Sequence, residues 1–205
     1  MSFLASTRTA VAAGSVALIT AGSLALFASP SQAAAPTCNG LRATIVGTNS
    51  SNEIEGTRGN DVIVGLAGND EIDGNGGNDV ICGGTGNDDI SGGGGNDKIF
   101  GQAGSDDVDG DSGADRVKGG SGNDDIDGSS GNDVVWGDSG RDRIDGESGR
   151  DVLRGGSGND RIEGGSGNDR ISGGSGADRV TQGSFSDDDD DDRDDRDDRD
   201  DNDDD

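Results

Sequence analysis

Apolar residues recur at every ninth position through most of the chain. From Gly56 to Thr181, fourteen consecutive nonapeptides follow the pattern G-x-x-G-x-D-x-U-x, in which U is apolar. The U column contains Ile63, Ile72, Ile81, Ile90, Ile99, Val108, Val117, Ile126, Val135, Ile144, Leu153, Ile162, Ile171 and Val180. A repeat this regular predicts that one small unit, stacked on itself, makes up the fold.

The order of residues within each unit predicts a glycine-rich turn followed by a three-residue strand, x-U-x. Side chains alternate along a strand, so an inward U requires that both of its neighbours point outward. With U inward, each turn of the solenoid needs two units, about 18 residues, to bring the chain back over itself. We therefore predict an all-β fold, a parallel β-roll or β-solenoid of 14 nonapeptide repeats, with two opposed sheets and a thin core.

The turns carry an invariant aspartate. It occupies position 6 of every unit as Asp61, Asp70, Asp79, Asp88, Asp97, Asp106, Asp115, Asp124, Asp133, Asp142, Asp151, Asp160, Asp169 and Asp178. Glycine at positions 1 and 4 permits a positive φ and leaves the carbonyl groups unobstructed. Calcium takes about six to eight oxygen ligands, a mixture of carboxylates and carbonyls. One turn cannot supply them all, but two stacked turns can.

These columns together resemble the RTX, or hemolysin-type, calcium-binding repeat family, and the resemblance covers 126 of 205 residues. It implies that each ion sits on one edge between a unit and the next unit but one, held by the Asp column and by backbone carbonyls of the glycine turns. Such glycines include Gly83, Gly86, Gly92, Gly95, Gly119, Gly122, Gly155, Gly158, Gly164 and Gly167. Two ladders of turns with about six gaps each imply at most roughly twelve calcium ions.

Position 2 departs from the family pattern, which has glycine there. Only Gly84, Gly93, Gly120, Gly156, Gly165 and Gly174 keep the glycine. The other units have Thr57, Leu66, Asn75, Gln102, Asp111, Ser129, Asp138 and Glu147. We expect weaker calcium binding, or none, at those turns.

The sparse core predicts that folding requires the metal. One inward apolar residue in nine buries too little surface to offset the entropy of ordering the chain. Stacked aspartates also repel one another without a cation between them. We therefore expect a disordered metal-free chain and a folded calcium-bound chain. The alternatives are a Gly/Asp-rich disordered tract, which the regular columns oppose, and a metal-free solenoid, which stacked buried aspartates oppose.

Counted from Gly56, odd and even units present different outward residues. The odd units carry eight apolar and five basic residues, one Ser and no acid, whereas the even units carry nine acids, three arginines, two hydroxyl residues and no apolar residue. An exposed apolar patch usually marks an interface. Its candidate residues are Val64, Val80, Phe100, Val134, Trp136 and Val152. The expected partners are a second copy, an anionic cell-surface polymer or the acidic tail of the same chain; the alternative is strand propensity alone.

Residues 1–33 have the features of a secretory signal peptide. Arg8 gives a positive start, residues 11–27 are mostly apolar, and residues 31–33 read Ser-Gln-Ala, a small-x-small cleavage site. A membrane anchor is the alternative, and cleavage after Ala35 is a second option. No other segment is long and apolar enough to span a bilayer. We expect a secreted, extracellular protein, free or associated with the cell surface, with no membrane span after cleavage.

Residues 34–55 are expected to cap the roll. The repeat register persists there in degenerate form, with Ile45 and Ile54 at the apolar position and Asn52 in place of Asp. Cys38 and Cys82 are the only cysteines. Outside the cell, cysteines that lie close together are oxidised, so we expect a Cys38–Cys82 disulfide.

Residues 182–205 are expected to be a cap remnant followed by a disordered acidic tail. From Asp187 to Asp205 the chain has fifteen Asp, three Arg and one Asn. The tail could hold calcium loosely, act on mineral surfaces, or keep the protein soluble. The formal net charge of −27 argues against nucleic acid as a partner.

Catalytic chemistry has little support in the sequence. The chain has no His and no Tyr, the serines lie in glycine turns, and the carboxylates are assigned to metal or solvent. We expect no enzyme. The leading interpretation is a secreted calcium-binding protein whose β-roll (residues 56–181) folds on binding Ca²⁺. The alternative is an envelope or adhesion protein that uses the apolar and basic face, with calcium purely structural.

Overall fold

The computed structural model describes residues 34–183. The expected signal peptide and the acidic tail lie outside these residues. The β-structure lies within one unit of the chain, which begins at Ala35. Within the described residues no helix is long and apolar enough to cross a membrane.

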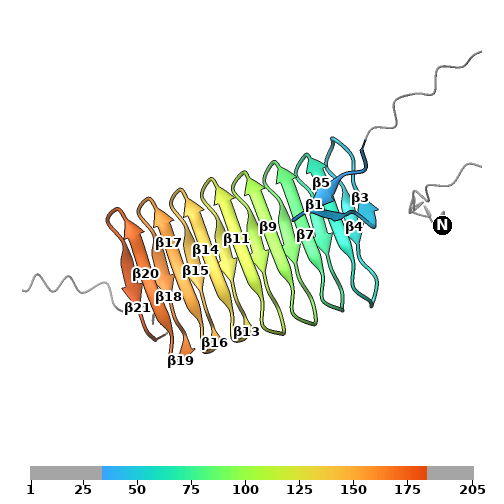
Figure 1. Cartoon of the computed structure of the whole chain (residues 1–205). Coiled ribbons are helices and arrows are strands. Elements are labelled where there is room, and N and C mark those ends of the chain that lie inside the picture. The colour runs from blue at the N-terminus through green and yellow to red at the C-terminus, as the bar shows by residue number, and fades with distance from the viewer. Residues whose placement is uncertain (1–33, 184–205) are drawn as a thin grey trace, which may run out of the picture. The chain divides into compact units, whose positions relative to one another are not determined.

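Two parallel eight-stranded sheets make up most of the fold (Figure 1). The odd sheet consists of β3 (Ile45–Val46), β5 (Val62–Ala67), β7 (Val80–Thr85), β9 (Lys98–Ala103), β11 (Arg116–Ser121), β14 (Val134–Ser139), β17 (Val152–Ser157) and β20 (Arg170–Ser175). The even sheet consists of β4 (Glu53–Glu55), β6 (Glu71–Asp73), β8 (Asp89–Ser91), β10 (Asp107–Asp109), β12 (Asp125–Asp127), β15 (Arg143–Asp145), β18 (Arg161–Glu163) and β21 (Arg179–Thr181).

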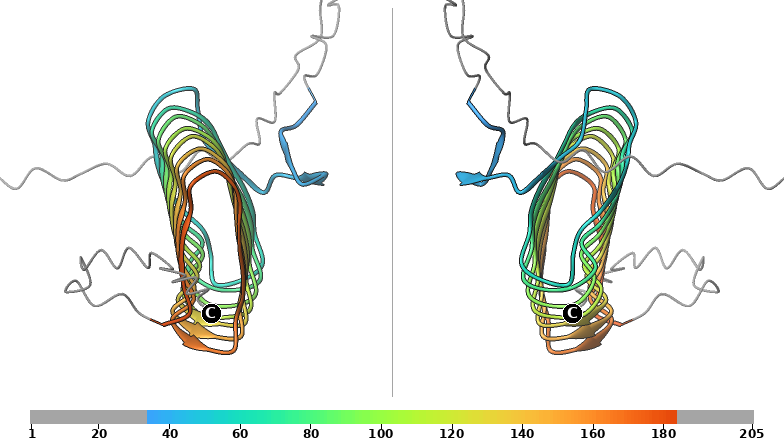
Figure 2. Two further views of the ribbon diagram at one scale, coloured as in Figure 1. Left: turned by 90° about the vertical axis from the view of Figure 1, so that its left-hand side faces the viewer. Right: turned by 90° about the vertical axis from the view of Figure 1, so that its right-hand side faces the viewer.

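The strand register advances by two repeats in each layer. Ile63 pairs with Ile81 in the odd sheet, and Ile72 pairs with Ile90 in the even sheet. Seen along the stack, successive turns superpose as flattened rings (Figure 2). The predicted parallel β-solenoid with 18 residues per turn is therefore confirmed. The stack has about eight turns because the degenerate units around Ile45 and Ile54 add a layer before the first full repeat.

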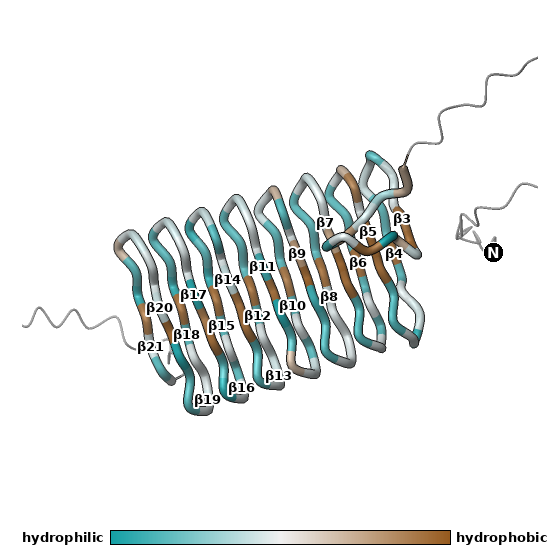
Figure 3. Tube along the Cα trace, viewed as in Figure 1, coloured by the Kyte–Doolittle hydropathy of each residue, from teal (hydrophilic) through white to brown (hydrophobic). Residues whose placement is uncertain are grey.

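The core consists of two rows of apolar side chains, one from each sheet, that meet between the sheets. Every U residue from Ile63 to Ile162 is at most 1% exposed, and Figure 3 shows the corresponding hydrophobic band across the strands. The row opens at its C-terminal end, where Ile171 is only partly buried and Val180 is 44% exposed. Since the core is one residue thick per strand, the turns on both edges lie close to it.

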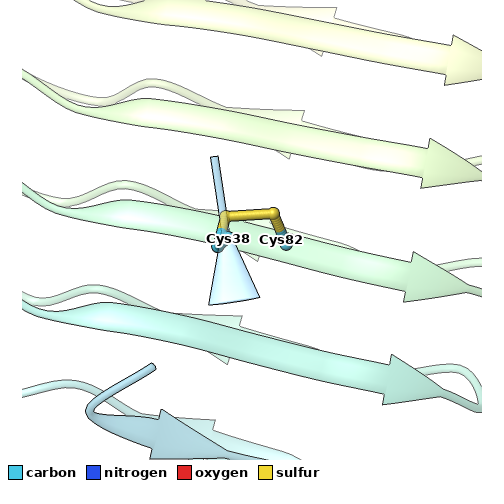
Figure 4. Close-up of a disulfide and its surroundings, with 2 residues drawn as sticks. All are labelled: Cys38 and Cys82. Atoms are coloured by element: carbon cyan, nitrogen blue, oxygen red, sulfur yellow. A yellow bond between two sulfur atoms is a disulfide. The ribbon is translucent and has the colours of Figure 1, made fainter. Parts of the chain in front are cut away.

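The segment before the roll forms a small hairpin on the outside of the odd sheet. Strands β1 (Thr37–Cys38) and β2 (Leu41–Arg42) pair antiparallel, and Cys38 forms a disulfide with Cys82 of β7 (Figure 4). Cys38, Val64, Val80 and Cys82 form a second buried cluster. Val64 and Val80 are thus buried by the chain's own hairpin, which corrects the expectation that they belong to an exposed patch.

Turns alternate between two edges of the roll. Edge A, as we name it, holds the turns that follow an even-sheet strand, such as residues 74–79. Edge B holds the turns that begin in the last residues of an odd-sheet strand, such as residues 83–88. On edge A, short segments pair into a third sheet of β13 (Ser130–Gly131), β16 (Ser148–Gly149) and β19 (Ser166–Gly167). Both edges repeat the same turn, so each presents one continuous column of aspartates.

Candidate metal centre

After the first turn, the backbone of the turns takes the same form whether or not position 2 is glycine. Seven of the eight non-glycine residues at position 2 have a positive φ: Leu66 (86°), Asn75 (66°), Gln102 (81°), Asp111 (63°), Ser129 (62°), Asp138 (71°) and Glu147 (59°). Thr57, in the first turn, is the exception. Non-glycine residues rarely occupy this region, so the turn geometry imposes it. In these seven turns, the replacement of glycine at position 2 therefore leaves the backbone conformation of the turn unchanged.

Edge A stabilises this backbone with carboxylates that precede the turn. Asp109 Oδ1 accepts the N–H of Asp111 at 2.8 Å, and Asp127 Oδ1 accepts the N–H of Ser129 at 2.8 Å. An Asx turn of this type favours a left-handed residue. From the sequence alone, these outward aspartates are expected only to form a charged face.

Glycine at position 1 is required because two oxygen atoms converge where a side chain would begin. A Cβ on Gly74 would lie 2.5 Å from the Gly92 carbonyl oxygen and 2.9 Å from Asp79 Oδ2. A Cβ on Gly83 would lie 2.5 Å from Asp88 Oδ2 and 3.0 Å from the carbonyl oxygen of Gly101. The space inside each turn is thus lined by a carboxylate oxygen of its own layer and a carbonyl of the next.

The predicted glycine ligands fall into two groups. Gly83, Gly92, Gly119, Gly155 and Gly164 are at position 1, where each faces the Oδ2 atom of its own turn. Gly86, Gly95, Gly122, Gly158 and Gly167 are at position 4, where each has a positive φ and packs against the position-4 carbonyl of the preceding layer. Both columns therefore stack carbonyl groups along the edges of the roll.

The aspartates form two ladders along the edges. On edge A the backbone N–H of Asp79 donates to Asp97 Oδ1 at 2.7 Å, and on edge B the N–H of Asp88 donates to Asp106 Oδ1 at 2.9 Å. Twelve such bonds of 2.7–3.1 Å join successive layers from Asp61 to Asp169 and from Asp70 to Asp178. Each predicted aspartate therefore stacks on the aspartate two repeats away.

The second oxygen of these carboxylates lacks a hydrogen-bond partner. In twelve aspartates, from Asp70 to Asp169, the Oδ2 atom is buried and accepts no hydrogen bond. The first member differs: Asp61 Oδ2 accepts the N–H and hydroxyl of Thr57. A buried oxygen without a partner is costly, so a repeated set of twelve points to a ligand at this place.

Burial raises the pKa of the ladder aspartates from Asp70 to Asp160. It raises the pKa to about 6 in the middle of the roll, at Asp97, Asp106, Asp115, Asp124, Asp133 and Asp142. The backbone N–H bond to each carboxylate opposes the rise, and the neighbouring carboxylates add to it. Desolvation thus makes the ionised carboxylates unfavourable unless a positive charge accompanies them.

Asparagine at position 5 forms another ladder, which the sequence analysis did not identify. Asn78 Oδ1 accepts the N–H of Asn96 at 2.7 Å, and Asn96 Oδ1 accepts the N–H of Ala114 at 2.7 Å. These bonds run from one layer back to the preceding one, opposite to the aspartate bonds. The signal was present, because nine of the fourteen position-5 residues are Asn.

The oxygen set fits a hard cation. Among residues 34–183 no three His, Cys, Asp or Glu side chains gather in a metal-binding group. A site here must therefore combine the aspartates of two layers with backbone carbonyls, which is the ligand mixture that calcium accepts. Soft or nitrogen-preferring metals would find neither histidine nor free thiolate, since both cysteines are in the disulfide.

The family comparison agrees with this geometry. The model for the RTX calcium-binding nonapeptide repeat, in four copies, matches residues 46–81, 83–117, 118–153, 145–180 and 154–189, which together cover more than half of the chain. The chain belongs to the RTX calcium-binding repeat family. A comparison with curated proteins found no match. The RTX β-roll is a structural calcium-binding fold, and this chain is a calcium-binding repeat protein.

Proposed function

We propose that this RTX protein is secreted and that its β-roll folds when calcium binds between stacked turns. The observation that carries the proposal is the set of twelve buried Oδ2 atoms without a partner. Burying a carboxylate without a partner or counter-ion is unfavourable. A cation between layers would supply the missing partner for each one.

The proposed ligands of each ion are two aspartates from adjacent layers of one ladder and the carbonyls of the two turns. Examples of these pairs are Asp79 with Asp97 on edge A and Asp88 with Asp106 on edge B. Two ladders of seven aspartates have twelve gaps in total. We therefore propose up to roughly twelve ions. The gap between Asp61 and Asp79 is the weakest, because Thr57 already satisfies Asp61 Oδ2.

Secretion would set the timing of folding. We propose that residues 1–33 direct export, that residues 34–55 cap the roll, and that residues 56–181 form the calcium-binding region. Extracellular calcium-binding modules have dissociation constants of about 0.1–1 mM. A chain with such sites would stay unfolded where calcium is scarce and fold outside the cell, since a ligand of the native state stabilises it by mass action.

Counting bound ions tests this assignment. In native mass spectrometry of residues 34–205, saturating calcium is expected to add about ten to twelve ions. Asp124→Asn is expected to lose about two of them, because Asp124 lies between two gaps of its ladder. The matched control is Asp89→Asn, an exposed carboxylate on β8, which should keep the full count. Equal counts in both variants would show that the ladders are not the sites.

A second candidate function is binding at the outer surface of the odd sheet, with calcium purely structural. The observation that favours it is the placement of Trp136 between two cations. Lys118 Nζ lies 5.2 Å from the ring centroid and Arg154 Cζ lies 5.9 Å from it. If this function holds, Trp136→Ser and Phe100→Ser together should reduce self-association or surface attachment without changing the ion count. Sedimentation and cell fractionation with and without chelator measure this.

A further inference from the structure

One outer surface of the roll is positively charged and is not covered by another described element. We name it the basic face: the outward positions of β9, β11, β14, β17 and β20, on either side of the core column. It carries the basic side chains Lys98, Arg116, Lys118, Arg154 and Arg170 and no acid at these positions. The exposed acid Asp138 lies just beyond them, toward the edge-B end of β14. No other sheet surface within residues 34–183 has this balance, since the even sheet presents acids over most of its length. The face therefore suits a polyanion.

Trp136 marks the middle of the basic face. Its strand, β14, lies between β11 and β17, and its ring centroid lies 5.2 Å from Lys118 Nζ and 5.9 Å from Arg154 Cζ. A cation over an aromatic ring is held in place by the ring's negative face. The tryptophan thus lies between two positive charges, one on each flanking strand, and its ring is half-buried.

The same sheet already binds a non-repeat segment of its own chain at the other end. The hairpin β1–β2 covers β5 and β7 and buries Val64, Val80 and Cys82. The cover stops there, and Phe100 of β9 is only partly buried against this cluster. The basic face begins at this border and runs to the last strand, so the hairpin leaves most of the sheet for another partner.

We propose that the acidic tail of the same chain, residues 187–205, docks on the basic face. The tail carries fifteen Asp and three Arg, a formal charge of −12, against the five positive charges of the face. Such complementarity favours association and orientation. Because the tail is covalently attached, its effective concentration near the face exceeds that of a free polymer at ordinary concentrations.

The roll ends at the edge that leads onto the odd sheet, and the chain after it is long enough to span the basic face. Strand β21 ends at Thr181 on edge A. Each earlier turn at this edge carries the chain from the even sheet onto the odd sheet. A Cβ on Gly164 would lie 3.2 Å from the Gln182 carbonyl oxygen. Gln182 therefore continues the stack of turn carbonyls on this edge. From β20 to β9 the face spans about 19 Å at ~4.8 Å per strand. The segment from Ser184 to Asp205 reaches about 70 Å when extended.

Calcium should control this contact, a step that rests on the proposed function. Residues 56–181 have 26 acids and 11 bases, so without metal the roll as a whole repels the tail. Each ion adds two positive charges, and about eight ions would reverse the sign. Calcium loading of the ladders would therefore both fold the basic face and remove the repulsion that opposes docking.

The chain's two lysines allow a direct test. Lys98 and Lys118 are the only lysines in the sequence, and both lie on the basic face. A zero-length reagent that joins amines to carboxylates at neutral pH should link them to aspartates in residues 187–205 of the full chain in calcium. Mass spectrometry of tryptic peptides would identify the links, and a salt concentration of ~1 M should reduce them about tenfold, because screening then acts within ~3 Å.

Matched variants and labels distinguish the possible occupants. Arg143→Lys places an amine on the opposite sheet, where the tail is not expected, and it should form few links to the tail. An equal mixture of unlabelled and ¹⁵N-labelled chains should give links within one chain only. Mixed-label links would identify a second copy as the occupant, and an absence of tail links would leave an external anionic polymer; either result overturns the proposal, as would equal linking at position 143.

Far-UV circular dichroism of the same samples separates this proposal from the proposed function. A chain that folds in calcium but forms no tail links would overturn the docking alone. A chain that is folded in chelator and still forms tail links would support the docking and overturn its calcium control. Links that appear only when calcium folds the roll are the expected result.

Discussion

From Asp70 to Asp169, each ladder aspartate uses its two oxygens differently. Oδ1 accepts a backbone N–H from the preceding layer, as between Asp97 and Asp115 at 2.7 Å. Oδ2 turns inward to the position-1 glycine of its own turn and has no partner. The first bond holds the layers together without metal, whereas the second oxygen remains available to a cation. An Asn substitution at these positions therefore removes charge without removing the layer-to-layer acceptor.

Two glycines in one turn provide a test at the residue scale. A Cβ on Gly92 would lie 2.9 Å from both Asp97 Oδ2 and the Gly110 carbonyl, whereas a Cβ on Gly94 would lie 3.6 Å from its nearest neighbour. We expect Gly92→Ala to lower the free energy of unfolding in calcium by about 1–3 kcal/mol, because the backbone must shift. Gly94→Ala should change it by less than about 0.5 kcal/mol. Urea unfolding measures both, and equal effects would contradict the oxygen-lined turn.

At the element scale, strands and turns contribute differently to the stability of the roll. The strands contribute one inward side chain per unit, and that column alone makes the core. The turns contribute the Asp and Asn ladders, whose bonds run in opposite directions between layers. Because the ladder carboxylates are desolvated and stacked, the turns oppose the metal-free fold at neutral pH even as their hydrogen bonds support it.

This conflict predicts an unusual pH dependence of the metal-free chain. In the folded state burial raises the pKa of the central ladder aspartates, such as Asp115 and Asp133, to about 6, above their unfolded value. A carboxyl group with a raised pKa destabilises the fold as pH rises through that range and favours it as pH falls. We therefore expect calcium-free chain to gain β-structure between about pH 7 and pH 4.5.

Far-UV circular dichroism of exhaustively dialysed protein measures this gain. The ion pair of Arg143 with Asp125 is exposed on both sides, so an Arg143→Gln variant is a control that should show the same pH profile. Calcium affinity should fall over the same interval, because ions must then displace protons. A metal-free chain with more β-structure at pH 7.5 than at pH 5 would contradict the role given to the buried carboxylates.

For the whole molecule, repetition determined how much could be predicted. The columns of Asp and of U residues predicted the parallel roll, its turn of two repeats and the stacking of Asp61 on Asp79, because a strict period leaves only one register. The expected Cys38–Cys82 disulfide placed the segment before the roll near Cys82, but the hairpin over Val64 and Val80 could not be predicted from it, since the hairpin's sequence is not repeated.

Two further features lay beyond the pattern for different reasons. The Asn column was visible as Asn at position 5, but its role depends on the offset between layers, which brings Asn78 Oδ1 to the N–H of Asn96. The left-handed backbone at Leu66 and Gln102 was hidden, because their side chains give no sign that the turn imposes a glycine-like conformation.

The most direct test of the central claim is a calcium titration of residues 34–205 after removal of metal, followed by far-UV circular dichroism, with magnesium as the control and Trp136 fluorescence in parallel. We predict a cooperative transition from coil to β-structure with calcium and none with magnesium, because the sites need more oxygen ligands than magnesium accommodates. A chain already fully β-structured in chelator at neutral pH, or one unchanged by ~10 mM calcium, would contradict calcium-coupled folding.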